Sequence, residues 1–168
     1  MPSTVLASES LASSKTDWLH DFDLWLEIFV LFNFFCLFGD IALAHGSNRF
    51  RNSAEYIPLL FSPLAALLLF CGLLVRIRSG RTATWKNLGY LVAWFSLAVG
   101  AAGVIYHLDS HFFFERTLKS LTYTAPFVAP LAYMGLGCLL LMNRYVLHTT
   151  KEWPHWVLFF ALGGFVGN

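Results

Sequence analysis

Charge is scarce in this sequence. Asp, Glu, Lys and Arg together make up 12% of the 168 residues, whereas hydrophobic residues make up 57%. Soluble globular domains carry about 25% charged residues, so a water-soluble fold is not the natural interpretation. The net charge is only +1, and the basic residues lie beside long apolar blocks instead of forming a patch of their own. Nucleic acid is therefore excluded as a partner.

The sequence also lacks the common motifs of soluble enzymes. It has no Gly-rich phosphate loop, no HExxH and no Ser, His and Asp in a hydrolase order, so nucleotide and hydrolase chemistry have no support. Its three cysteines, Cys36, Cys71 and Cys138, lie in three different apolar blocks without CxxC spacing. We expect them to be small, reduced residues packed inside the protein.

Long apolar runs dominate what is present. Three of them hold about 20 residues with few or no charges, which is enough to cross roughly 30 Å of hydrocarbon as a helix. A fourth run is slightly shorter but still sufficient. The runs cover residues 24–44, 57–75, 88–106 and 125–142. The sequence therefore predicts an all-α fold, a polytopic integral membrane bundle with four transmembrane helices.

The two ends of the chain differ from these runs. Residues 1–23 form a polar tail, and residues 24–168 are expected to form a single transmembrane domain. The last segment, 156–168, is a partial fifth span with about 11 apolar residues, or roughly 17 Å of helix. Because this is well short of a crossing, we expect a truncated segment that belongs to a longer protein.

A short internal similarity indicates a parallel two-helix repeat. Residues 62–65 read SPLA and residues 129–132 read APLA, and a histidine lies upstream of each proline, at His45 and His111. Each unit would then consist of a span, a loop with a histidine and a span that carries the proline. Two helices per unit make such repeats parallel in topology.

The loop charges predict an orientation. Seven basic residues lie on the side of the N-terminus and four on the other side. By the positive-inside rule, the N-terminus is cytoplasmic and the first histidine loop is on the outer face. The seven are Lys15, Arg76, Arg78, Arg81, Lys86, Arg144 and Lys151, and the four are Arg49, Arg51, Arg116 and Lys119.

A cluster of histidines and carboxylates is predicted at that outer face. His107 and His111 are four residues apart at the end of the third span, a spacing at which two imidazoles can share one metal ion. His45, after the first span, is a candidate third ligand. Asp40 and Asp109 are candidates to ligate the ion or to orient an imidazole. This pattern predicts a transition-metal site.

The same residues allow a b-type haem. His45 and His107 would supply its two axial ligands, and Gly100 and Gly103 on the third span would leave room for a flat ring. The alternative is that these glycines let membrane helices pack closely and that the histidines hydrogen-bond to nearby loops and carboxylates.

Two further interpretations remain open at this point. Asn33, Cys36 and Asp40 share one stripe of the first span, so Asn33, Asp40 and the histidines could conduct protons or a cation. Asp40 could instead be a helix-end carboxylate wetted by the interface. Glu27 lies within a turn of the start of its span, where it can reach the membrane surface, so it is the less informative acid.

The last interpretation is a non-enzymatic structural or accessory membrane protein without a cofactor. The 17 phenylalanines suit packing against lipid and helices and need no ligand. The expected partners are the lipid bilayer and a second copy or a larger membrane complex. The sequence leaves open whether the protein is an enzyme.

Overall fold

The structure is a computed structural model that describes residues 21–47, 49–50, 52–110, 116–117, 130–145 and 153–166. Within these residues it contains five α-helices, one short 3-10 helix and no strand. The predicted all-helical fold class is therefore confirmed.

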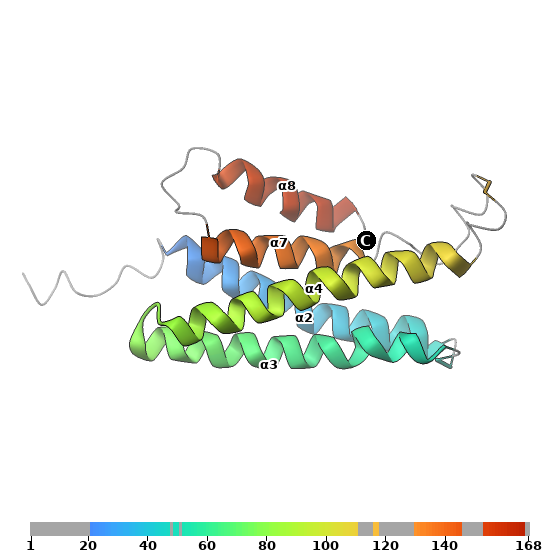
Figure 1. Ribbon diagram of the computed structural model, residues 1–168, viewed down its shortest axis with the longest axis horizontal. Coiled ribbons are helices and arrows are strands. Elements are labelled where there is room, and N and C mark those ends of the chain that lie inside the picture. Colours follow the sequence, from blue (N-terminus) through green and yellow to red (C-terminus); the bar gives the residue numbers. More distant parts are fainter. Residues whose placement is uncertain are drawn as a thin grey trace, which may run out of the picture.

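Four helices lie side by side along the long axis of the molecule, and a fifth lies outside them (Figure 1). The inner four are α2, α3, α4 and α7, and α8 packs chiefly on α7. Their bounds are α2 Phe22–Ser47, α3 Tyr56–Ser79, α4 Ala83–Ser110, α7 Leu131–Tyr145 and α8 Trp153–Val166, with the 3-10 helix η2 at Ser53–Glu55.

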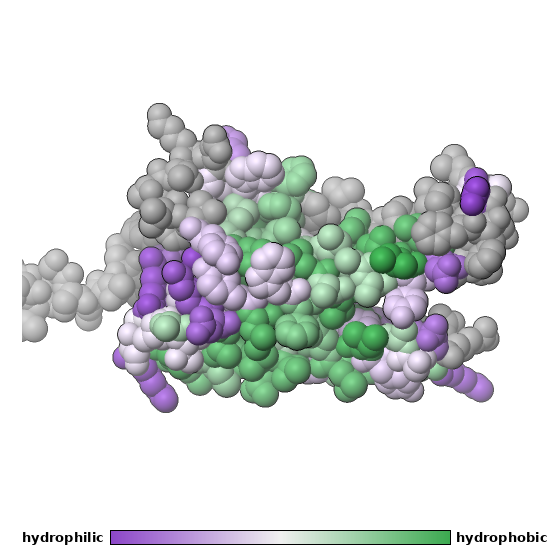
Figure 2. Space-filling view, viewed as in Figure 1, coloured by the Kyte–Doolittle hydropathy of each residue, from purple (hydrophilic) through white to green (hydrophobic). Residues whose placement is uncertain are grey.

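Three helical segments are long and apolar enough to cross a membrane: Phe22–Ser47, Ser53–Ser79 and Ala83–Asp109. They contain the first three predicted spans and extend each of them at both ends. The fourth predicted span, 125–142, is described only from Pro130 onward, so the count of four spans stays a prediction. Figure 2 shows hydrophobic residues over the middle of the bundle and hydrophilic residues at its two ends, as expected for a membrane protein.

Local hydrogen bonds define two of the helix junctions. Before α3, Asn52 Oδ1 accepts from the N–H of Ala54, and Glu55 Oε1 accepts from the N–H of Asn52, a capping box. After α3, Gly80 adopts a φ of 74° and donates its N–H to the carbonyl of Arg76. Positive φ suits glycine because it has no Cβ. The resulting tight turn brings the end of α3 next to the start of α4.

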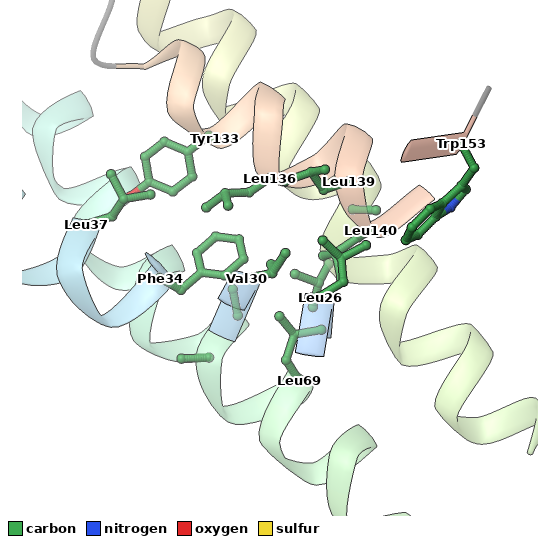
Figure 3. Packing of buried hydrophobic residues seen from close by; sticks show 14 residues of the cluster. Leu26, Val30, Phe34, Leu37, Leu69, Tyr133, Leu136, Leu139, Leu140 and Trp153 are labelled. Carbon is green, nitrogen blue, oxygen red and sulfur yellow. The ribbon is translucent and has the colours of Figure 1, made fainter. Parts of the chain in front are cut away.

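The middle of the bundle is a packed apolar core (Figure 3). Val30 and Phe34 of α2 are fully buried, and Leu69 of α3 and Leu140 of α7 pack with them. The Phe34 ring meets the Tyr133 ring with centroids 6.1 Å apart. Side chains from three helices thus interdigitate, and close packing of this kind makes the core sensitive to changes in volume.

Small residues let α4 and α7 approach closely. A Cβ on Gly100 would lie 2.6 Å from Cγ of Met134 and 2.9 Å from the carbonyl oxygen of Pro130. A Cβ on Gly103 would lie 2.8 Å from Cβ of Pro130. The expectation that these glycines leave room for a flat ring is therefore wrong, because Pro130 and Met134 fill that space. Close packing of helices explains them instead.

The buried face of α2 is not the one that the sequence indicates. Cys36 and Asp40 are exposed, and Asn33 donates to the carbonyl of Phe29 in its own helix at 2.8 Å. The stripe predicted to face a neighbouring helix is wrong at these positions. Asp40 fits the alternative of a helix-end carboxylate. Cys71 is also exposed and Cys138 is half-buried, so only the latter approaches the expected packing; all three cysteines are free.

Candidate functional site

Buried charge is concentrated at the end of the bundle where α2 and α4 begin and α3 and α7 end. Two carboxylates and two guanidinium groups are buried there, and Glu27 is 0% exposed. We call this group the charge cluster. Its members are Asp21, Asp23, Glu27, Arg76, Arg81, Trp85, Asn143 and Arg144.

Glu27 is the centre of the charge cluster. Its carboxylate accepts from Trp85 Nε1 at 2.7 Å, from Arg144 Nη2 at 2.9 Å and from Arg76 Nη1 at 3.4 Å. One side chain of α2 is thereby bonded to one side chain each from α4, α7 and α3. Removing a carboxylate from water is costly unless cations and donors replace the lost hydration, and here three donors do so, two of them cations.

The indole ring of Trp85 has a second role. The guanidinium carbon of Arg144 lies 3.6 Å from the centre of this ring, and that of Arg76 lies 5.3 Å from it. Both arginines therefore make cation–π contacts with one ring while they pair with Glu27. One turn further along α4, Gly89 leaves the space that Arg144 occupies, because a Cβ there would overlap the guanidinium group.

Two further ion pairs form the rim of the charge cluster. Arg76 Nη2 donates to both carboxylate oxygens of Asp21, at 2.6 and 2.7 Å. Arg81, in the turn after α3, pairs with the buried Asp23. These contacts hold the residues just before and at the start of α2 against the end of α3.

Asn143 connects Asp23 to Arg144. As placed, its Nδ2 donates to the backbone carbonyl of Asp23 at 3.3 Å. With the amide reversed, the nitrogen donates to Asp23 Oδ1 at 3.0 Å and the oxygen accepts from Arg144 Nη1 at 2.8 Å.

In the charge cluster, three carboxylates face three guanidinium groups, so the cluster is neutral overall.

A smaller polar group lies at the opposite end of the bundle. His45 Nδ1, in the last turn of α2, pairs with Glu55 Oε2 at 3.2 Å. The rings of His45 and His107 meet edge to face with centroids 6.2 Å apart, and the Phe50 ring stacks on His45 at 6.3 Å. We call His45, Glu55 and His107 the histidine group. The side chains of His45 and Glu55 are 23% and 20% exposed, so this pair is far less enclosed than Glu27.

The residues predicted to bind a metal are only partly brought together. His45 and His107 are neighbours, Asp40 and Asp109 are exposed, and His111 lies outside the described residues. In the described part of the chain, no group of three or more His, Cys, Asp or Glu side chains could hold a metal ion. Metal binding is therefore not supported by this structure, and the predicted ligands stay untested.

In the described residues, polar groups of α3 and α7 meet in the middle of the bundle. The hydroxyl groups of Ser62 and Tyr133 are hydrogen-bonded to each other, and both reach the carbonyl of Pro58, at 2.9 and 3.3 Å. In Figure 3, Leu136 and Leu140 lie between Tyr133 and the end of the core at Leu26 and Trp153. The polar groups of the middle are thus separated from the charge cluster by apolar side chains.

The charge cluster was missed by reasoning from the sequence. The sequence places Glu27 near the membrane surface, and it places Arg76 and Arg144 among the loop charges. A signal was present: Asp23 and Glu27 are four residues apart on one helical face, and both arginines end spans on the same predicted side of the membrane. When acids and arginines lie at the same depth in a membrane, they are expected to pair with each other.

No protein-family model matches this chain, and no match is found among curated proteins or solved structures. Three features of the molecule itself bear on its function. These are the membrane-length helices, the charge cluster and the histidine group.

Proposed function

We propose that this chain is an integral membrane protein with a structural or accessory role, in which residues 24–168 form one membrane domain. Three helices that are long and apolar enough to cross a membrane support the placement of the chain in a membrane. The predicted surplus of basic residues on the N-terminal side supports a cytoplasmic position for the charge cluster. On this proposal the protein is not an enzyme.

One observation carries the structural role. The four charged side chains buried in the described helices are Asp23, Glu27, Arg76 and Arg144, and each is held in an ion pair. Buried ionisable groups in membrane proteins are functional candidates by default, and catalysis or transport needs one that can exchange partners. Here each buried charge is held by a fixed partner, and the contacts of Glu27 join four helices, which favours scaffolding.

A second candidate function is binding of a transition metal or b-type haem at His45 and His107. Its basis is the edge-to-face contact of these two imidazoles, with Glu55 beside His45, although two side chains alone do not make a complete ligand set. A carboxylate on one ring nitrogen is a common way to orient a histidine ligand. His111 would be the next ligand, with Asp40 or Asp109 in support.

Metal analysis separates the two functions. The full chain is purified gently from metal-replete membranes, and its iron, copper and zinc content and optical spectrum are compared with those of a His45→Ala, His107→Ala variant. The structural proposal predicts no stoichiometric metal and no haem band in either protein. About one metal or haem per chain, lost in a variant with unchanged helicity, would overturn it in favour of the second function.

A further inference from the structure

The end of the bundle that holds the charge cluster carries more positive charge than the cluster uses. Asp21, Asp23 and Glu27 are matched by Arg76, Arg81 and Arg144. Two more cations lie on the same turn between α3 and α4: Arg78 and Lys86 are both exposed, and neither has an ion pair within the described residues. Among the residues that the structure describes at this end, two positive charges are therefore left over and presented to the surroundings.

The backbone fixes these two cations on one short hairpin. Arg78 lies in the last turn of α3 and Lys86 in the first turn of α4. Between them, the N–H of Thr82 donates to the carbonyl of Gly80 at 2.9 Å, and the N–H of Lys86 donates to the carbonyl of Thr82 at 3.1 Å. Arg81 belongs to the same turn and is 54% exposed although it pairs with Asp23.

The hairpin lies at the edge of the apolar surface. Ile77 on α3 and Leu91 and Trp94 on α4 are exposed apolar residues within about three turns of the hairpin, on the side of the bundle middle. The hydrophilic residues of this end follow directly after the hydrophobic zone (Figure 2). In a bilayer, the phosphate groups of lipids lie at such a boundary, and exposed lysine and arginine there attract anionic lipids.

We infer that the turn between α3 and α4 binds the headgroups of anionic phospholipids, with Arg78 and Lys86 as the main contacts and Arg81 beside them. The ligand is a lipid phosphate diester in a membrane of net negative charge. The inference uses the membrane placement proposed above but not the structural role. It adds a lipid partner of defined charge to the partners expected from the sequence, which are the bilayer as a whole and a second copy or a larger membrane complex.

Lipid retention in native mass spectrometry tests this inference. The full chain is reconstituted with equal amounts of phosphatidylglycerol and phosphatidylcholine, released gently, and the bound lipids are counted. The wild-type protein is expected to retain phosphatidylglycerol preferentially. An Arg78→Gln, Lys86→Gln variant should lose this preference by about fivefold or more, since each cation near the surface contributes a severalfold attraction.

Two controls make the outcome decisive. Arg49→Gln removes an exposed cation from the opposite end of the bundle and should leave the preference unchanged. Helicity and thermal stability should be equal in all variants, because Arg78 and Lys86 make no ion pair in the described structure. Added inorganic phosphate should not displace the lipid.

Three results would overturn the inference. They are equal retention of both lipids by the wild type, an equal loss in Arg49→Gln, and displacement of the lipid by inorganic phosphate, which would indicate a site for free phosphate. None of these changes the metal analysis, so the structural role would stand. A metal-loaded protein with normal lipid preference would overturn only the proposed function.

Discussion

The two ends of this helical bundle hold polar groups of opposite character. At one end, Glu27 is fully buried and accepts three hydrogen bonds from three helices. At the other end, the His45 ring nitrogen contacts the Glu55 carboxylate at 3.2 Å, and both side chains are about one-fifth exposed. The difference shows which polar contacts the fold depends on. Water or headgroups can replace a lost partner in the histidine group, whereas nothing replaces one beside Glu27.

The largest expected effect comes from Glu27→Ala. The substitution leaves Arg76 and Arg144 buried without their carboxylate, and such uncompensated charges cost about 3–5 kcal/mol. Reversible unfolding in mixed micelles measures the change in the free energy of unfolding. Glu27→Gln keeps a hydrogen-bond acceptor and should fall between the wild type and the alanine variant.

A matched control for this prediction is Asp40→Asn on the same helix. Asp40 is exposed and should tolerate the loss of charge within about 0.5 kcal/mol. If the Asp40 and Glu27 variants were destabilised equally, the two ends of α2 would not differ as described.

The second effect concerns the close approach of α4 and α7. A Cβ on Gly137 would lie 2.8 Å from the backbone oxygen of Ala93, which cannot move without separating the helices. Gly137→Ala should therefore destabilise the protein by about 1–3 kcal/mol, as overpacking does elsewhere. Gly39→Ala is the control, because no neighbouring atom lies within 4 Å of the position that its Cβ would take. A tolerated Gly137→Ala would mean that packing there is looser than the structure shows.

A smaller effect is expected in the middle of the bundle. Tyr133→Phe removes the hydroxyl that bonds to Ser62 and to the carbonyl of Pro58. Hydrogen bonds between membrane helices contribute about 0.6 kcal/mol on average, so the loss should be about 0.5–1.5 kcal/mol. Ser62 retains its bond to Pro58 at 2.9 Å, which limits the cost. A loss as large as that of Glu27→Ala would place the decisive polar contact in the middle.

The smallest effect is expected in the histidine group. Glu55→Gln weakens a partly exposed ion pair but retains an oxygen to accept the N–H of Asn52. Such pairs contribute about 0–1 kcal/mol, so thermal unfolding should change little. A destabilisation well above this range would give the histidine group a structural weight comparable to that of the charge cluster, and the contrast between the two ends would fail.

The positions of the helices in this protein are easier to predict from the sequence than the face of each helix that is buried. The runs at 24–44, 57–75 and 88–106 predict three observed helices because length and hydropathy alone decide whether a helix can cross a membrane. These helices are apolar on nearly all sides, so no periodic stripe marks the buried face. For that reason the sequence indicates that Asp40, and not Glu27, faces a neighbouring helix, and the structure shows the reverse.

That His45 and His107 lie at the same end of the bundle follows from topology, since alternating spans place the ends of the first and the third span at one membrane face. Whether they bind a metal does not follow, because a ligand set depends on side-chain geometry that spacing cannot supply. The pairing of Arg76 and Arg144 with one carboxylate also cannot be predicted from the spacing of residues in the sequence. Arg76 lies near the end of α3, which contains Pro63, and Arg144 lies near the end of α7, which follows Pro130. These are the two prolines of the predicted repeat, and that repeat stays a prediction.

A double-mutant cycle between Glu27 and Arg144 tests the central claim most directly. The free energy of unfolding is measured for the wild type, Glu27→Gln, Arg144→Gln and the double variant. If these side chains depend on one another as their 2.9 Å contact indicates, the double variant will be less destabilised than the sum of the single variants by about 1.5–3 kcal/mol. Additive effects would contradict the claim that the charge cluster joins the helices at this end of the bundle.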